Sequence, residues 1–212
     1  MDRVVRLADD MDGVVALTPP LLERELRARA ARLRLVLSDV DGTLTDGGVF
    51  YSERGEAMKR FSMRDGMGVE RLREDGVETA LVTRETSAIV ARRAEKLRIR
   101  RLYQGVVDKE SAFSAILAET GYDASQVAYI GDDVNDLGIM SLVARRGLIA
   151  APLDAVSPVL RAVHYRCARG GGGGAFRDFA EWILELRQLA RRPHAFDVRL
   201  VDPTIDETGG MP

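Results

Sequence analysis

Short runs of apolar residues alternate along this chain with segments in which apolar residues recur every three or four positions. Continuous apolar runs of this kind are typical of buried strands, and the longer spacing is typical of helices that cover a sheet. The runs predict strands at 33–40, 77–83, 101–106, 127–132, 148–152 and 165–168. The spaced segments predict helices at 66–75, 87–97, 109–120, 136–147, 156–163 and 174–189. Strands that alternate with helices predict an α/β fold, in which a Rossmann-like parallel sheet is flanked by helices on both faces.

The remaining segments predict how the chain is organised around this sheet. Apolar positions flank a polar turn within 49–62, which predicts a β-hairpin that projects after the first strand. We expect residues 1–32 to form an N-terminal extension with a Pro-initiated helix, 33–190 the main domain, and 191–212 a C-terminal tail. The glycine run at 169–175 is expected to be a flexible loop. The connections between the predicted strands are too short to hold an inserted cap domain.

Polar residues stand where the predicted strands end. Asp39 and Asp41 end the first strand, and Thr83 ends the second. Lys109 comes just after the third strand. The fourth strand runs into a short acidic segment that supplies Asp132, Asp133 and Asp136. Because a fold of this kind binds ligands at the carboxyl ends of its strands, we expect these side chains to share one rim of the sheet.

The chemistry of these residues points to phosphoryl transfer. Clustered carboxylates repel one another unless a cation lies among them, and oxygen ligands without His or Cys favour Mg²⁺. Lys109 offers a positive charge for a phosphate group and Thr83 a hydroxyl donor. One aspartate can attack phosphorus to form an aspartyl-phosphate, and the second can act as general acid and base. The rim therefore predicts an Mg²⁺-dependent phosphoryl-transfer site.

Four of these segments, taken in order, resemble the motifs of the haloacid dehalogenase superfamily of phosphatases. They are the Asp-Val-Asp-Gly-Thr sequence from Asp39, then Thr83, Lys109, and the Gly-Asp-Asp-Val-Asn-Asp sequence from Gly131. The resemblance runs from about residue 34 to residue 189, and four motifs that each follow a strand are far more specific than a lone Asp-x-Asp.

This resemblance implies a role for each residue. Asp39 would be the nucleophile and an Mg²⁺ ligand, and Asp41 would be the acid and base and would bind Mg²⁺ through its backbone carbonyl. The other roles are phosphoryl binding by Thr83 and Lys109, completion of the metal site by Asp132, and support of that site by Asp133 and Asp136. A second Asp-x-Asp-Gly sequence, with Asp10 and Asp12, lacks a clean apolar strand before it and suitable partners after it. We assign it no catalytic role.

The predicted hairpin, the segment 103–109 and the glycine run resemble those of a capless branch of the superfamily. This branch consists of sugar-acid phosphatases of the 3-deoxy-manno-octulosonate 8-phosphate phosphatase type, which are homotetramers. That type usually has Thr-Gly-Arg at the second motif, whereas Thr83 is followed here by Arg84 and Glu85. This difference resembles the branch that acts on nine-carbon keto-deoxy acid 9-phosphates, whose specificity pair would correspond to Glu85 and Lys96. The resemblance thus favours a nine-carbon substrate, with the eight-carbon 8-phosphate as the alternative, and places Arg84, Glu85 and Lys96 at the substrate.

Composition removes several other classes of function. The net charge of −2 without a long run of one sign gives no indication of a nucleic-acid partner. No apolar run is long enough for a membrane helix, and the acidic N-terminal segment does not resemble a signal peptide. The single cysteine fits a reducing compartment, so we expect a cytoplasmic protein.

Two further classes of function remain open from the sequence. A phosphotransferase would share the aspartyl-phosphate step, but such enzymes usually carry a cap that excludes water. A non-catalytic scaffold would have no need to keep Asp39, Asp41, Thr83, Lys109 and Asp132 together. A phosphatase that acts on a phosphorylated sugar acid is therefore the preferred prediction.

Overall fold

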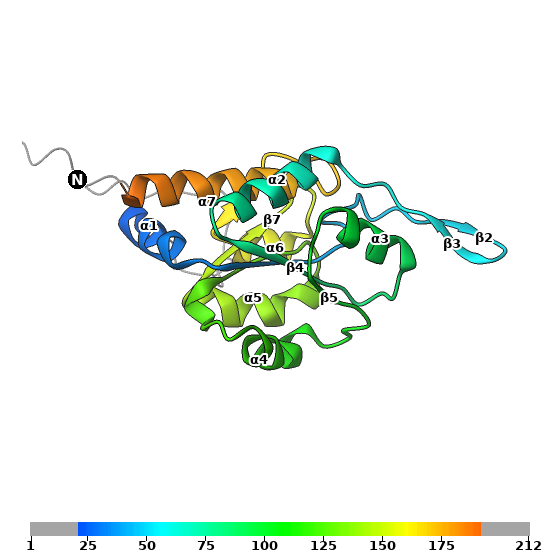
Figure 1. Ribbon diagram of the computed structural model, residues 1–212, viewed down its shortest axis with the longest axis horizontal. Coiled ribbons are helices and arrows are strands. Elements are labelled where there is room, and N and C mark those ends of the chain that lie inside the picture. Colours follow the sequence, from blue (N-terminus) through cyan, green and yellow to red (C-terminus); the bar gives the residue numbers. More distant parts are fainter. Residues whose placement is uncertain (1–20, 192–212) are drawn as a thin grey trace, which may run out of the picture.

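Six parallel strands form the centre of the protein, in a computed structural model that describes residues 21–191 (Figure 1). In spatial order, β5-β4-β1-β6-β7-β8, the strands are Arg101–Tyr103, Glu78–Val82, Leu35–Ser38, Val127–Ile130, Leu148–Ala151 and Tyr165–Arg166. Strand β1 lies in the middle, and its parallel pairing aligns Ser38 with Leu81 of β4 and with Ile130 of β6. The loops that follow β1, β4 and β6 therefore leave the sheet side by side.

Both faces of the sheet are buried, which explains why the strands read as continuous apolar runs. Along β1, Val36 belongs to the hydrophobic cluster on one face, whereas Leu35 and Leu37 belong to the cluster on the other. This alternation is the two-residue period of a strand. The predicted α/β fold with a parallel sheet is confirmed.

Helices cover the sheet in two layers (Figure 1). The layer on one face is built from α1 (Glu23–Arg32), α2 (Met63–Glu74), α3 (Ala88–Lys96) and α7 (Ala175–Arg191). The opposite layer consists of α4 (Lys109–Thr120), α5 (Leu137–Ala144) and α6 (Ser157–Ala162), with the short 3₁₀ helices η1 (Ala124–Gln126) and η2 (Val134–Asp136) in the connections. Helix α2 begins a turn earlier than its apolar spacing predicts, because the Ser62 side chain accepts a hydrogen bond from Arg64 N and caps it.

Helix α1 packs on the main core although it precedes the first strand. Leu26 and Ala30 are buried in the same cluster as the apolar face of α7. Arg187 of α7 also donates a hydrogen bond to the carbonyl of Ala30 at 2.8 Å. The predicted C-terminal tail from residue 192 onwards, the Asp10–Asp12 sequence and the first residues of the predicted N-terminal helix lie outside the described residues, whereas Arg191 is the last residue of α7.

The predicted β-hairpin is present as β2 (Phe50–Ser52) and β3 (Gly55–Met58), and it projects well beyond the sheet (Figure 1). Within residues 21–191 the hairpin is the segment that extends farthest from the two helix layers, and these residues contain no inserted cap domain. None of the described helices combines the length and apolar character that a membrane span requires.

Candidate active site

The loop after β1 brings Asp39 and Asp41 to the rim of the sheet. Asp39 continues the strand geometry, because its backbone N–H still donates to the carbonyl of Ile130 at 2.9 Å. The chain then turns sharply, and three successive amides, of residues 43–45, donate to the carbonyl of Val40. Gly42 has a φ of +86°, and a Cβ there would lie 2.0 Å from an oxygen of Asp132. A glycine is therefore needed at this position for two separate reasons, its backbone conformation and the close approach of the carboxylate.

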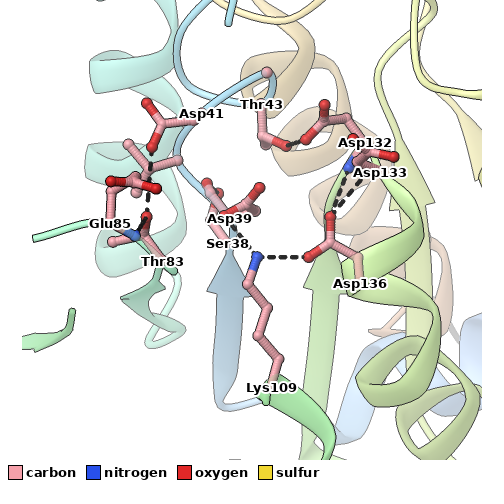
Figure 2. Close-up of polar contacts among 12 residues, drawn as sticks. Ser38, Asp39, Asp41, Thr43, Thr83, Glu85, Lys109, Asp132, Asp133 and Asp136 are labelled. Carbon is pink, nitrogen blue, oxygen red and sulfur yellow. Dashed lines mark hydrogen bonds and ion pairs between the residues drawn. The ribbon is translucent and has the colours of Figure 1, made fainter. Parts of the chain in front are cut away.

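Lys109 links the first and fourth motifs (Figure 2). It is the first residue of α4, and its side chain is almost fully buried. Its Nζ lies 2.7 Å from Oδ1 of Asp39 and 2.6 Å from Oδ1 of Asp136. Burial opposes the charge on this amine, but the two carboxylates outweigh burial and raise the pKa of Lys109. Lys109 is thus a fixed positive charge beside Asp39.

Asp136 organises the loop after β6. Its Oδ2 accepts hydrogen bonds from the backbone N–H groups of Asp132 at 2.9 Å and Asp133 at 3.2 Å. Its Oδ1 accepts from Tyr129 Oη and from Lys109 Nζ, both at 2.6 Å. With both oxygens engaged, Asp136 is placed to shape the loop. Asp133 is exposed and caps η2 through Val134 N, so its side chain supports the loop rather than facing Asp39.

Three carboxylates crowd together at this rim, namely Asp39, Asp132 and Asp136, and one oxygen from each lies within 4.8 Å of the other two. Burial raises the pKa of Asp39 well above its usual range, and repulsion by Asp136 and Asp132 adds to this shift against the opposing effect of Lys109. Burial and the charge of Asp136 likewise raise the pKa of Asp132 to about 6. A cation among these groups would relieve the repulsion, and a donor set made only of oxygens suits Mg²⁺. Since both oxygens of Asp136 are already bonded, Asp39 and Asp132 are the carboxylates best able to hold Mg²⁺.

Thr83 lies on the opposite side of Asp39 from Asp132 (Figure 2). It is buried directly after β4, and its hydroxyl donates to Oδ2 of Asp41 at 3.4 Å. The same hydroxyl accepts a hydrogen bond from Glu85 N at 3.2 Å. The structure thus brings the predicted residues of all four motifs together at one rim.

The three predicted substrate residues are less closely grouped. Arg84 and Glu85 are exposed in the loop after β4, and Lys96 is exposed at the last residue of α3. Among the described residues no hydrogen bond or ion pair joins Glu85 to Lys96, and the length of α3, roughly 12 Å at the usual helical rise, separates its two ends. Both side chains are expected to contact the substrate rather than each other, so their assignment to the substrate stays a prediction.

Lys59, which our sequence analysis did not single out, also reaches the site. It directly follows β3, and its Nζ lies 2.5 Å from Oδ1 of Asp41 and 3.2 Å from a carboxylate oxygen of Glu56. Burial opposes its charge, but the hydrogen bonds and charges of the two carboxylates raise the pKa of Lys59. The sequence contains one signal for this contact. Lys59 lies in the returning half of the predicted hairpin, where the chain comes back to the sheet beside the first motif.

The glycine run is a second unpredicted part of the site. Gly171 N–H donates to Oδ1 of Asp154 at 2.9 Å, and Gly172 N–H donates to the carbonyl of Thr43 at 3.1 Å. Both glycines are buried against the loop that carries Asp39 and Asp41. The run predicted to be a flexible loop is therefore held against the loop after β1, through the backbone hydrogen bond from Gly172 to Thr43.

Comparison with known proteins connects this site to one family. No protein-family profile matches the chain. It is 39% identical over 156 residues to the 3-deoxy-D-manno-octulosonate 8-phosphate phosphatase of Yersinia pestis, which covers 74% of this chain and 82% of the relative. It is 36% identical over 160 residues to the phosphatase of the same name from Haemophilus influenzae, with coverages of 76% and 87%.

Solved structures agree with these relatives. The cobalt-bound phosphatase of Haemophilus influenzae superposes with a TM-score of 0.72 at 35% identity, covering 76% of this chain and 93% of that one. The phosphatase of Moraxella catarrhalis, in complex with magnesium, phosphate and a KDO molecule, superposes with a TM-score of 0.73 at 33% identity, covering 78% and 93%.

Proposed function

Because this chain belongs to the 3-deoxy-D-manno-octulosonate 8-phosphate phosphatase family of the haloacid dehalogenase superfamily, we propose that it hydrolyses that eight-carbon sugar-acid phosphate with the help of Mg²⁺. The main support for the proposal is the group formed by Asp39, Asp132 and Lys109 at the rim. Relatives that cover most of the chain are named for this activity. The eight-carbon substrate, which came second in the sequence analysis, now takes precedence over the nine-carbon one.

The reaction follows from the positions of four side chains. An oxygen of Asp39 attacks phosphorus, the bond from phosphorus to the sugar oxygen breaks, and Asp41 gives its proton to that oxygen. Asp41 then takes a proton from water, whose oxygen attacks the aspartyl-phosphate, so that inorganic phosphate leaves and Asp39 is restored. We assign the binding of phosphoryl oxygens throughout to Lys109 and Thr83. Mg²⁺, when bound by Asp39, Asp132 and the Asp41 carbonyl, supplies positive charge that offsets the charge of the phosphoryl group.

A direct test of the substrate is a panel of phosphorylated sugars and sugar acids assayed with Mg²⁺. We expect kcat/KM for the eight-carbon 8-phosphate to exceed that for nine-carbon 9-phosphates by about tenfold or more, since pockets that match a substrate's hydroxyl groups discriminate at least this well. Release of inorganic phosphate at several substrate concentrations measures it. A preference for the nine-carbon acids would contradict the proposal.

The nine-carbon acids remain a second candidate because of one specific observation, the exposed Glu85 in place of the usual arginine at the rim. If this candidate is correct, Lys96→Ala should raise KM for acid substrates and leave a small neutral ester unaffected, because a lost ground-state contact appears in KM. Equal weakening of both substrates would show that Lys96 does not recognise the substrate carboxylate.

The hairpin supports a further part of the proposal, that the protein assembles as a homotetramer. Phe50, Tyr51 and Met58 are 61%, 75% and 60% exposed, although they carry large apolar side chains. A two-stranded hairpin that stands alone is marginally stable in water, so a surface that covers these side chains is expected. Pairing with the hairpins of neighbouring copies would bury them and would close the open rim.

We expect the triple variant Phe50→Ser, Tyr51→Ser, Met58→Ser to lose the tetramer while the sheet core stays folded. The reason is that all three side chains lie outside both hydrophobic clusters of the core. Light scattering gives the molar mass, and circular dichroism verifies the fold. A wild type that is a fully active monomer at the assay concentration would disprove this assembly.

A further inference from the structure

Lys59 holds one oxygen of the Asp41 carboxylate, and a different part of the chain holds the other. The contact to Oδ1 comes from Lys59 at 2.5 Å, and the contact to Oδ2 comes from the Thr83 hydroxyl at 3.4 Å. Thr83 is fixed by the sheet, since it directly follows β4, whereas Lys59 is fixed by the hairpin, since it directly follows β3. The orientation of Asp41 therefore depends on both.

This ion pair differs from the surface pairs around it. The Lys59 side chain is only 2% exposed, and Asp41 is 26% exposed. By contrast, the neighbouring Arg60 pairs with Asp46, and these side chains are 63% and 41% exposed. Exposed pairs contribute little to any fixed geometry, whereas a buried amine keeps its partner in one place. Glu56 forms a second ion pair with the same amine, at 3.2 Å, which helps to hold Lys59 in place.

We propose that Lys59 is a positioning residue for the acid and base of this enzyme, and that through it the hairpin controls proton transfer at Asp41. The inference rests on the proposed function, because it assigns Asp41 the proton-transfer role there. Asp41 has two rotatable side-chain bonds, and Figure 2 shows its carboxylate turned towards Thr83. Without Lys59, Thr83 would be the remaining partner of that carboxylate among the residues that the structure describes, through one long hydrogen bond.

A residue that acts through Asp41 has a recognisable kinetic effect. Proton donation matters most when the leaving oxygen is a poor leaving group, as in alkyl and sugar phosphates, and least for 4-nitrophenyl phosphate. General acid–base catalysis contributes roughly 10²–10⁴-fold, so poor positioning of the acid should forfeit part of that factor. We expect Lys59→Met to lower kcat/KM for alkyl phosphates by roughly 10- to 100-fold, with a several-fold smaller loss for 4-nitrophenyl phosphate, because kcat/KM reports the step in which Asp41 protonates the leaving oxygen.

The experiment measures kcat and KM of the full-length protein with Mg²⁺ on a series of aryl and alkyl phosphates of rising leaving-group pKa. It compares the wild type, Lys59→Met, Asp41→Asn and the double variant. We expect Lys59→Met to steepen the dependence on leaving-group pKa, and to add no more than about twofold to the loss in Asp41→Asn, because effects through a shared residue are not additive. Arg60→Met, one position away and paired with an exposed partner, serves as the matched control and should change kcat by less than about twofold.

Two results would overturn the inference. One is a Lys59→Met loss in kcat/KM that is equal for all leaving groups, which would indicate a purely structural role, because kcat/KM reports the step that releases the leaving group. The other is a full additional loss in the Asp41→Asn background, which would show that Lys59 acts independently of Asp41. Should Lys59→Met fold poorly by circular dichroism, Lys59→Gln provides the same comparison with a donor retained. Wild-type protein inactive on every ester would instead refute the proposed function.

Discussion

Asp39→Asn is expected to reduce hydrolysis of phosphate monoesters by about 10⁴-fold or more, the scale of loss seen when a covalent nucleophile is removed. An amide is a far weaker nucleophile than a carboxylate, and it is also a poorer ligand for Mg²⁺. Asp39 is buried, and Lys109 Nζ lies at 2.7 Å from it, so the substitution alters the chemistry at the centre of the site.

The fold should tolerate this change. Burial, Asp136 and Asp132 all raise the pKa of Asp39, so the structure without a cation already disfavours its negative charge. A neutral side chain of the same shape removes one of the repelling charges, and Lys109 keeps Asp136 as a partner at 2.6 Å. Thermal melting without Mg²⁺ should therefore show a midpoint equal to or above that of the wild type.

Phosphate release from 4-nitrophenyl phosphate and from the sugar-acid phosphate measures the loss. Chelation of Mg²⁺ from the wild type should give a similar loss that added Mg²⁺ reverses. Full activity in Asp39→Asn, or in chelated wild-type protein, would contradict the aspartyl-phosphate mechanism.

The second large effect is expected at the glycine run, for Gly171→Ala. A Cβ at this position would lie 1.9 Å from the carbonyl oxygen of Gly42 and 2.6 Å from that of Thr45. Both contacts are with backbone, so the loop that carries Asp39 and Asp41 must move. A misplacement of about 1 Å at a catalytic group can cost about 10²-fold in rate, and overpacking typically costs about 1–3 kcal/mol of stability.

The matched control is Gly173→Ala, in the same run. Gly173 is exposed, and its nearest contact would be the Gly170 carbonyl at 3.0 Å, within the run itself. We expect near wild-type kcat for Gly173→Ala and a loss of about 10²-fold for Gly171→Ala, measured beside chemical denaturation of both. Equal kcat values for the two variants would show that the run does not support the catalytic loop.

The sequence was sufficient for the sheet and for the motifs that end its strands. Strands β1, β4 and β6 are buried on both faces, so their continuous apolar runs were distinctive, and the polar residues that follow them share a rim because parallel strands point the same way. The hairpin was also predictable, because its apolar positions flank a polar turn within one short segment. These features depend on neighbours in the chain or on the direction of the strands.

The parts that escaped prediction depend on contacts between distant segments. Lys59 is an ordinary charged residue in its own segment, and only the return path of the hairpin brings it to Asp41. The glycine run has the composition of a loose linker, and its packing against Thr43 follows from the position of α7. The assignment of Glu85 and Lys96 to the substrate stays a prediction, because spacing along the chain does not specify which end of a helix meets a ligand.

The contact between Gly172 and Thr43 affects the stage of synthesis at which the site can take its final geometry. The loop that carries Asp39, the proposed nucleophile, leaves the ribosome early, but the segment that braces it comes near the end of the described chain, just before α7. Helix α7 in turn packs on α1 and α2, which are also made early. Since chains emerge from their N-terminal end, a nascent chain holds Asp39 and Asp41 long before it can fix their geometry. Phosphatase activity should therefore appear only when the last helix has been released and has docked.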